Sequence, residues 1–431
     1  MNSATVRKER ASTGETHAAS RAPRQRRVSR AGTLKDVSPA SYHLVWITTL
    51  LLLAAGLCMV LSVSVAEALN GGDKFVYLRP QALAAAAGLV LLGLVTRVNY
   101  ARLRVSSIFF LVVMAIILIL VHFPEFSYTE GGAASWFRLG PAKFQPSEFA
   151  KLALVLAGAH LLSVRRVQKR EFGAYFWPLG AVGLGMCGLV VLEGDLGTAV
   201  IMTGLLLGMF WVAGMKRGHW FTMFGVGVLT AGALVFSSAE RRARVFSFLD
   251  PSADPLGESY QLCQSLVALG RGGWFGVGPG QSVQKFEYLP KAHTDMIFSI
   301  LGEEIGLLGT GFVLLLFGVF AVACWQLARR CSDPMGKYLI AGCGMLVTFQ
   351  AVVNIGGVTG AMPLTGVPLP FISYGRSSLL VMLAAVGLIL AVARRAPVRS
   401  APSSRTRYKN VADIDSGRRN SRTRGAGAGA R

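Results

Sequence analysis

Apolar runs, each about as long as a bilayer core is thick, dominate the pattern of this chain. A helix needs roughly 20 apolar residues to cross the hydrocarbon core of a membrane. The runs predict ten spanning helices, at residues 43–69, 80–96, 105–122, 146–164, 173–192, 196–214, 219–237, 296–327, 338–360 and 374–394. We therefore expect an all-α polytopic membrane protein with about ten transmembrane helices.

Basic residues assign the two sides of the membrane. Lys and Arg cluster between spans two and three, four and five, six and seven, and eight and nine, on the side that also holds both tails. The positive-inside rule makes that side cytoplasmic. The opposite side receives the acids around Glu125, Glu193 and Asp195 and a large extracytoplasmic loop, residues 238–295, between spans seven and eight.

This large loop carries two patterned segments. Residues 241–249 mix arginines with aromatic side chains, as a segment lying in a membrane interface does. Residues 260–269 place leucines at helical spacing with glutamines between them, which predicts a short amphipathic helix.

Composition supports a membrane body with basic tails. Of 431 residues, 52% are hydrophobic and 15% are charged, and the net charge is +22. Residues 1–42 carry nine Lys and Arg against three acids, and residues 394–431 carry eleven against two. We expect disordered cytoplasmic tails at 1–42 and 395–431 around a transmembrane domain at 43–394. Nucleic-acid binding is one interpretation of such tails, but contact with anionic lipid suits so apolar a body better.

Cysteine spacing excludes two classes of site. The six cysteines form no CxxC pair and no cluster with histidine at metal-ligand spacing. Neither a disulfide framework nor a zinc site is therefore indicated.

The most informative segment runs from Tyr288 to Glu304. Asp295 stands where the polar loop meets the eighth span, and we expect it in the first helical turn. The helix terminus lowers the pKa of such a carboxyl and partial burial raises it. This position of Asp295 is consistent both with a catalytic base and with an acid that simply stabilises the helix. Glu303 and Glu304 lie deeper in the span, where acids are costly and either functional or paired with a base.

A second polar cluster opens the fourth span, from Lys143 to Lys151. Pro146 indicates a helix start, and Glu148 and Lys151 share a helix face. Either Glu148 and Lys151 form an internal ion pair, or Lys151 binds an anionic head group together with Lys143. Arg138 lies just upstream, at the membrane interface.

Three further segments lack helical pattern. Residues 193–198 form a tight turn with two acids, for which a turn cap is favoured over a cation site. The glycine-rich run 270–280 lacks the strand and the GK[ST] of a phosphate loop, so it predicts backbone that approaches a bulky substrate. Residues 363–378 hold three prolines and two glycines, and broken backbone at membrane depth predicts a cavity lining.

Five motifs in this order closely resemble the SEDS family of bacterial cell-division and cell-elongation proteins, over about residues 43–394. They are Phe144–Leu152, Asp195–Thr198, Phe248–Pro251, Tyr288–Glu304 and Leu369–Gly375. The sequence departs from the family at Arg376, where glycine is usual, at Gly194, where proline is common, and at Ala134 and Ser135, where basic residues are frequent.

The resemblance implies a lipid II polymerase of septal peptidoglycan synthesis, working on the outer face of the bacterial cytoplasmic membrane. It places the catalytic base at Asp295, which takes the proton of the acceptor sugar hydroxyl while undecaprenyl pyrophosphate leaves. Substrate-binding positions are then expected at Lys143, Glu148, Lys151, Arg138, His293, Glu303, Ser373 and Tyr374. The resemblance leaves open whether a divalent cation takes part, and the sequence shows no dedicated site for one.

The resemblance also implies partners and leaves alternatives. The expected partners are lipid II, a class B penicillin-binding protein that crosslinks the new strand, and membrane proteins of the division machinery. A lipid II flippase, an elongation-type polymerase and a scaffold for division proteins are the competing interpretations. Long basic tails and Phe248–Pro251 favour the division branch.

Overall fold

The computed structural model describes residues 39–69, 73–130, 133–139, 142–165, 172–252, 254–255, 257, 259–286 and 288–395. Both expected tails lie outside these residues, apart from their innermost ends. All ten predicted spans are helices, as the apolar runs require. They are α1 (Pro39–Leu69), α2 (Leu78–Arg97), α3 (Leu103–Leu120), α4 (Pro146–Arg165), α5 (Phe172–Leu192), α6 (Leu196–Ala213), α7 (Arg217–Phe236), α10 (Ile297–Arg330), α11 (Pro334–Val358) and α12 (Arg376–Arg395).

Eight of these helices are long and apolar enough to cross a membrane by length and composition. The apolar parts of the other two, Ser106–Leu120 in α3 and Phe176–Leu192 in α5, fall short of that length. The helical membrane architecture is thus confirmed, whereas the count of ten spans is not.

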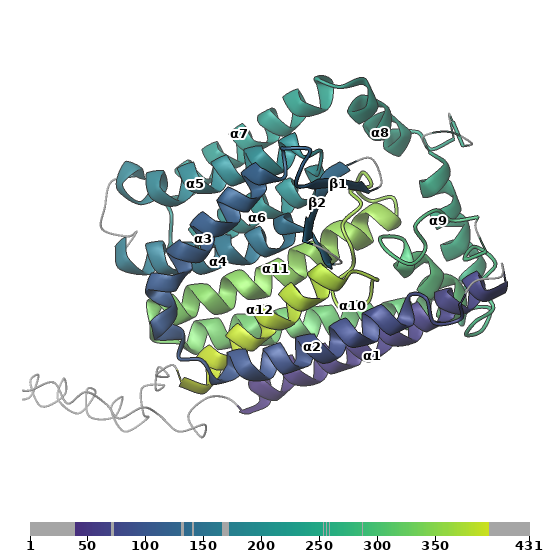
Figure 1. Ribbon diagram of the computed structural model, residues 1–431, viewed down its shortest axis with the longest axis horizontal. Coiled ribbons are helices and arrows are strands. Elements are labelled where there is room, and N and C mark those ends of the chain that lie inside the picture. Colours follow the sequence, from purple (N-terminus) through teal and green to yellow (C-terminus); the bar gives the residue numbers. More distant parts are fainter. Residues whose placement is uncertain are drawn as a thin grey trace, which may run out of the picture. The chain divides into compact units, whose positions relative to one another are not determined.

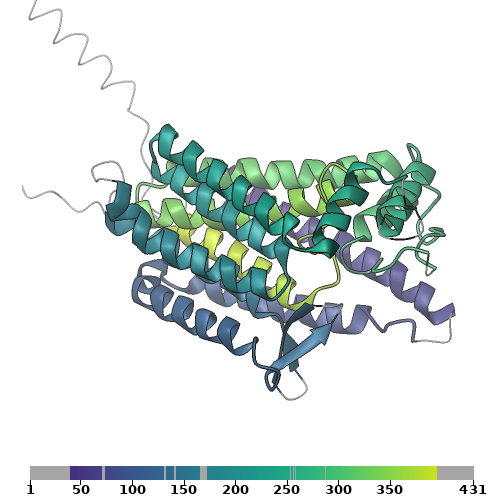
Figure 2. The ribbon, with the colours of Figure 1, turned by 90° about the horizontal axis from the view of Figure 1, so that it is seen from above.

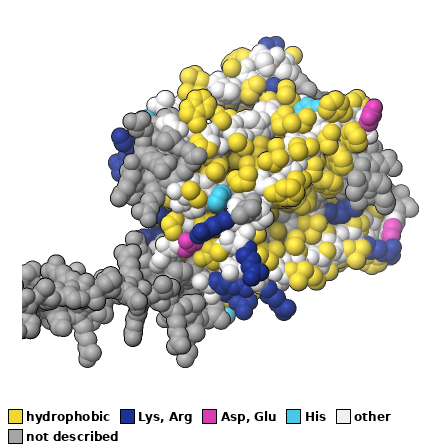
Figure 3. Space-filling model, turned by 60° about the vertical axis from the view of Figure 1, so that its left-hand side comes forward, with side chains coloured by type: hydrophobic (Ala, Val, Ile, Leu, Met, Phe, Trp, Pro, Cys, Tyr) yellow, Lys and Arg dark blue, Asp and Glu magenta, His cyan; other side chains and the backbone are white. Residues whose placement is uncertain are grey.

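The helices pack around α12, whose residues are nearly all buried. It lies along α2 and also contacts α4 and α11, while α1 packs on α10. Large apolar side chains remain exposed on the outer helices, as expected where lipid covers the surface. Figure 3 shows such apolar side chains over a broad face of the molecule. Helix α7, in which no residue is buried, contacts only α6 and α8 extensively.

The ends of the described body lie together. Ser41 at the start of α1 donates to Gln326 near the end of α10, at 2.7 Å between Oγ and Oε1. Arg395 at the end of α12 donates to the carbonyls of Arg97 and Val98, at the end of α2. The connection that contains α8 and α9 lies toward the opposite end of the bundle, as Figures 1 and 2 show.

A small sheet accompanies the helices of this nearly all-helical chain. Strands β1 (Ser127–Glu130), β2 (Ala133–Leu139) and β3 (Ala142–Phe144) pair antiparallel in the order β1-β2-β3. The strands are too short for a clear alternating pattern to stand out beside the apolar runs. The sheet leads directly into α4.

The loop before α10 contains two helices. The predicted amphipathic helix at 260–269 is confirmed as α9 (Tyr260–Gly272), and the arginine-rich segment forms α8 (Ala239–Leu249). Both lie at the polar end of the bundle (Figure 1).

Helix α10 is broken at Gly306, whose φ of 72° and ψ of −167° are not helical. The glycine-rich run supplies the hydrogen bonds that the break removes. Backbone nitrogens of Val277 and Gly278 donate to the carbonyls of Glu303 and Glu304, at 2.9 and 3.0 Å. A Cβ on Gly276 would stand 2.2 Å from the carbonyl oxygen of Glu304. The run therefore packs against a broken helix, and its expected approach to a substrate stays a prediction.

Candidate active site

Asp295 lies two residues before α10, so the sequence placed it slightly too far into the helix. The helix begins at Ile297 with Met296 as its N-cap. A tight turn carries the aspartate, because the backbone nitrogen of Thr294 donates to the Lys291 carbonyl at 3.0 Å. The Asp295 side chain is 5% exposed. It therefore sits at the polar rim of the bundle, withdrawn from solvent.

Burial is the main electrostatic influence on Asp295. It raises the pKa of this carboxyl above the ordinary value for aspartate, while Lys291, the Thr294 hydroxyl and Arg244 act in the opposite direction. The Thr294 Oγ1 donates to Asp295 Oδ1 at 2.9 Å. Since burial outweighs the other influences, the ionised carboxylate is a stronger base than an exposed aspartate.

A polar cavity of about 150 Å³ opens at Asp295. Its walls come from α8, α9, the turn before α10 and the α11–α12 connection, residues 359–375. The lining residues are Arg244, Ser247, Phe248, Gln261, Leu262, Lys291, Asp295, Leu364 and Gly366. Gly366 has a φ of +68°, and a Cβ there would approach Asp295 Oδ2 to 3.7 Å. The broken connection thus lines a cavity, as its prolines and glycines predicted.

Two amides of α11 hold this connection in place. Asn354 donates both amide hydrogens, one to the Asp295 carbonyl and one to the Val367 carbonyl, each at 2.8 Å. Gln350, one helical turn earlier, donates to the Pro368 carbonyl at 2.9 Å. Buried carbonyls of irregular backbone need such donors, because leaving them unpaired is costly.

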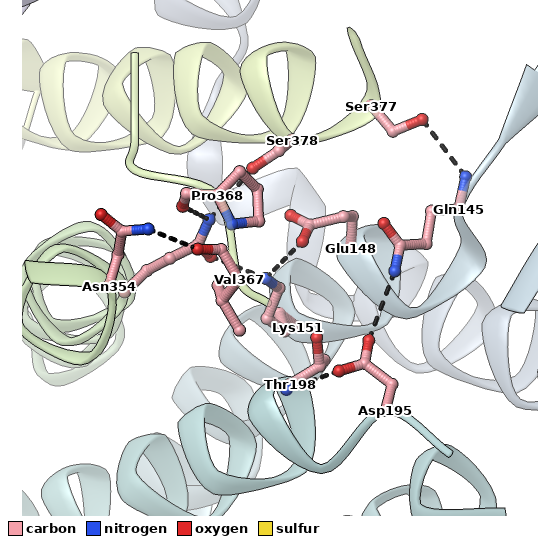
Figure 4. A network of polar contacts seen from close by, with 11 residues as sticks. Gln145, Glu148, Lys151, Asp195, Thr198, Asn354, Val367, Pro368, Ser377 and Ser378 are labelled. Carbon is pink, nitrogen blue, oxygen red and sulfur yellow. Dashed lines mark hydrogen bonds and ion pairs between the residues drawn. The ribbon is translucent and has the colours of Figure 1, made fainter. Parts of the chain in front are cut away.

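The ion pair expected between Glu148 and Lys151 is present and buried. Lys151 Nζ donates to Glu148 Oε1 and to Gln350 Oε1, each at 2.7 Å (Figure 4). The two side chains are 0% and 1% exposed, so neither reaches a head group in this conformation. Of the two interpretations of this cluster, the geometry matches the internal pair. Through Gln350, the pair supports the α11–α12 connection beside Asp295.

The α5–α6 turn joins the same network. Asp195 caps α6, with its Oδ1 accepting from the Thr198 backbone nitrogen at 2.9 Å, as the turn-cap interpretation requires. Its Oδ2 accepts from Gln145 Nε2 at 3.3 Å. Glu193, next to it, has two buried oxygens without a partner among the described residues, and burial raises its pKa to about 8.

Glu303 and Glu304 fasten the loop that precedes the site. Glu303 accepts from the Ser282 hydroxyl at 2.5 Å and from two backbone nitrogens of the same loop at 3.2 Å. Glu304 accepts from Lys285 Nζ at 2.9 Å and from the Ser62 hydroxyl at 2.6 Å. Glu303, expected to bind substrate, is fully buried and engaged with this loop. Both acids are paired, which was one of the two interpretations.

His293 belongs to an aromatic cluster beside Asp295. Its ring stacks on Tyr77 with a centroid separation of 4.2 Å and meets the edge of Tyr374 at 5.7 Å. Its carbonyl accepts from the Tyr374 nitrogen at 2.9 Å, and burial lowers the pKa of its imidazole. Ser373 Oγ accepts from the Leu369 nitrogen at 2.8 Å. These contacts tie the turn before α10 to the start of α12.

Lys143 and Arg138 are described only through their backbones. They are direct partners across the β2–β3 pair. Their side chains lie outside the described part of the structure, so their expected role at the substrate stays a prediction.

Four residues of the site escaped the sequence argument: Arg244, Lys291, Gln350 and Asn354. Lys291 stands inside the motif that identified Asp295, and Arg244 stands among other arginines. Gln350 and Asn354 carry a clearer signal, because amides one turn apart in an apolar span are costly unless they bind something. In the described part of the chain, no three His, Cys, Asp or Glu side chains gather to hold a metal ion.

Comparison with known sequences gives one consistent family. Residues 42–397 match the family described as Cell cycle protein, which covers FtsW, RodA and SpoVE. Stage V sporulation protein E of Bacillus subtilis is 39% identical over 363 residues, which cover 84% of this chain and 99% of that protein. A probable peptidoglycan glycosyltransferase FtsW of Aeromonas salmonicida is 39% identical over 350 residues, covering 80% of this chain and 88% of its own.

Solved structures agree with the sequence comparison. One chain, described as showing structural coordination of polymerization and crosslinking by a peptidoglycan synthase complex, superposes with a TM-score of 0.67 and 29% identity, covering 83% of this chain and 98% of its own. The rod shape determining protein RodA of Thermus thermophilus gives a TM-score of 0.60, also at 29% identity, with 81% and 95% coverage. This chain therefore belongs to the FtsW/RodA/SpoVE family, the SEDS proteins.

Proposed function

We propose that this protein is a peptidoglycan glycosyltransferase that polymerises lipid II into glycan strands. The observation that carries the proposal is the buried carboxyl of Asp295 in a polar cavity at one end of a membrane bundle. Relatives that cover most of this chain are named probable peptidoglycan glycosyltransferases, which supports the same activity. In this proposal the cavity opens at the membrane rim and receives a lipid-linked sugar from the bilayer, so the reaction needs no soluble sugar donor.

Asp295 is the proposed general base. Its carboxylate takes the proton from the 4-hydroxyl of the acceptor GlcNAc while that oxygen attacks the anomeric carbon of the donor MurNAc. The bond from that carbon to the diphosphate breaks, and undecaprenyl pyrophosphate leaves with the electron pair. A base of this kind contributes roughly 10²- to 10⁴-fold to a rate. Its elevated pKa suits the abstraction of a hydroxyl proton.

The supporting residues hold Asp295 in position through the backbone around it. Asn354 fixes its carbonyl, and the Glu148–Lys151 pair holds the α11–α12 connection through Gln350. His293, Ser373 and Tyr374 fix the backbone at the cavity rim. We assign these residues to positioning in the conformation observed, and we keep Lys143 and Arg138 as candidates for substrate contact.

We further propose that the cavity faces the outside of the bacterial cytoplasmic membrane. The start of α1 and the end of α12 lie at the end of the bundle away from α8 and α9, which line the cavity (Figure 1). The basic connections favour a cytoplasmic location for that end. Both tails would then be cytoplasmic. The proposed place of action is the division septum, with an elongation role as the alternative.

The proposed partner is a crosslinking enzyme, a class B penicillin-binding protein, together with membrane proteins of the division machinery. The structural neighbour described as part of a peptidoglycan synthase complex that coordinates polymerization and crosslinking supports this choice.

Purified protein in detergent with lipid II separates a polymerase from a flippase, because detergent removes the two sides that transport requires. We expect glycan polymer on gels, with more product when the cognate transpeptidase is present. Transport of lipid II across vesicles without any polymer, in both preparations, would contradict the proposal. Asp295→Ala cells that divide normally would favour a scaffold instead.

A further inference from the structure

The cavity at Asp295 contains more positive charge than a general base needs. Two of its lining residues, Arg244 and Lys291, are cations, and both act to lower the pKa of Asp295. Cations beside a base weaken it, because they stabilise its ionised form. Their presence is therefore better explained by an anion that shares the cavity with Asp295. Both side chains are exposed, so they stand at the mouth where a ligand would arrive.

Lys291 occupies a backbone conformation that disfavours lysine. Its φ is 56°, in the left-handed region that is unfavourable for a residue with a Cβ. Its carbonyl accepts from the backbone nitrogen and the hydroxyl of Thr294, at 3.0 and 3.1 Å, so the turn that carries Asp295 fixes this conformation. Glycine would form the same turn with less strain. A lysine held there despite the cost indicates a task for its ammonium group.

Arg244 differs from the two other arginines of α8. Arg241 and Arg242 donate to carbonyls at the end of α7, at 3.4 and 2.9 Å. Arg244 instead lines the cavity together with Ser247 and Phe248, which follow at helical spacing on the same face. It already has an interaction within the chain, so a ligand would exchange that partner for a new one.

The size of the cavity limits what fits beside these cations. At about 150 Å³ it is smaller than the roughly 300 Å³ at which drug-sized pockets begin. A compact anionic group fits this volume, and the sugars that react at Asp295 would extend beyond the mouth of the cavity. The guanidinium of an arginine binds phosphate oxygens in a bidentate manner, and lysine binds them as a point charge.

We propose that Arg244 and Lys291 form a subsite for the diphosphate of a polyprenyl-linked sugar, at the mouth of the cavity that holds Asp295. This inference rests on the proposed glycosyl transfer and adds the site of its leaving group. When the bond between the anomeric carbon and the diphosphate oxygen breaks, the electron pair passes to that oxygen, and the two cations neutralise the charge that develops. The hydroxyl proton goes to Asp295. Fixed positive charge at this point lowers the barrier.

Binding, measured apart from catalysis, tests the subsite. Full-length Asp295→Asn protein in nanodiscs is titrated with undecaprenyl diphosphate, undecaprenyl phosphate and inorganic pyrophosphate, because this background prevents turnover. Arg244→Gln and Lys291→Gln are each expected to weaken diphosphate binding about tenfold or more, and monophosphate binding less. Arg242→Gln is the matched control, with the same charge on the same helix, and should bind as before. Inorganic pyrophosphate should compete, which shows that the head group is recognised and not the lipid chain.

A further variant separates binding from folding. Lys291→Gly removes the ammonium and the backbone strain together, so thermal stability should be kept or raised while diphosphate affinity falls. Unchanged affinity in the folded Arg244→Gln/Lys291→Gln double variant would overturn the subsite. So would an equal loss in Arg242→Gln, or failure of pyrophosphate to compete. If diphosphate binds as expected but wild-type protein makes no polymer, the proposed activity fails and the subsite stands.

Discussion

The side-chain amide of Asn354, in the last turns of α11, donates to the backbone carbonyl of Asp295 at 2.8 Å. Its second hydrogen goes to the Val367 carbonyl at the same distance. One buried side chain thus fixes the carboxyl-bearing turn and the opposite wall of the cavity relative to each other. Under the proposed mechanism, catalysis by Asp295 depends on this contact, because a small displacement of a base costs much of its effect.

Asn354→Asp should therefore reduce polymerisation while leaving diphosphate binding intact. The carboxylate keeps the shape of the amide but offers no hydrogen to either carbonyl, and each unpaired buried group costs about 1–3 kcal/mol. We expect a fall in kcat of about tenfold or more with little change in KM. Thr348→Val on the same helix loses only a bond to the Gly344 carbonyl and serves as the control. Equal activity of Asn354→Asp and the control would remove the positioning role.

The Glu148–Lys151 pair should behave as an internal support. Lys151→Met leaves a buried carboxylate without its cation, a change that costs about 3–5 kcal/mol in buried pairs. We expect loss of folded yield and of activity. The double variant Glu148→Gln/Lys151→Met removes both charges, so its Tm and part of its polymerisation should recover. A double variant that regains stability but stays as inactive as Lys151→Met would indicate that Lys151 contacts substrate directly.

Two glycines of α10, one at the break and one beyond it, allow a matched test of the break. Gly306 has a φ of 72°, and a Cβ there would meet the Gly276 nitrogen at 2.4 Å. Gly306→Ala should lower the Tm by several degrees, because the strain of about 1–2 kcal/mol adds to the clash. A Cβ on Gly311, in the same helix, meets no described atom within 4 Å. Gly311→Ala should leave the Tm unchanged or raise it. Similar Tm values for the two variants would mean that the break is not needed for the fold.

The pH profile of polymerisation should report the pKa of Asp295. Burial raises this pKa, and the base must be ionised, so activity should rise with pH through a value above that of ordinary aspartate, near 3.9. Lys291 lowers the same pKa. Lys291→Gln should therefore shift the acid limb of the profile to higher pH, with Arg242→Gln again as control. If the acid limb stays in place or moves to lower pH, Lys291 does not lower the pKa of Asp295.

The same shift has a consequence for stability. A carboxyl whose pKa is higher in the folded protein binds its proton more tightly there than in the unfolded chain. The stabilising contribution of this group is complete below the unfolded pKa and is lost as pH rises through the folded value. The pH that ionises Asp295 for catalysis thus also reduces its contribution to folding, a common cost of a buried catalytic acid.

The sequence predicted the ten apolar helices and drew attention to Asp295 because both have strong local signals. Apolar runs located all ten helices, and the cost of an acid at the end of a span singled out Asp295. It missed contacts that join distant segments. The hydrogen bond between Asn354 and Asp295 spans 59 positions, and nothing local shows that Gly276 packs against the break at Gly306. The sheet and the helix break depend on tertiary contacts of this kind.

The initial rate of lipid II polymerisation by Asp295→Asn protein tests the central claim most directly. Amide and carboxyl have nearly the same shape, so folding, checked by Tm, and diphosphate binding should persist. The account predicts a rate at least about 10²-fold below that of wild type. A rate within about twofold of wild type, in a preparation with wild-type Tm, would contradict Asp295 as the general base.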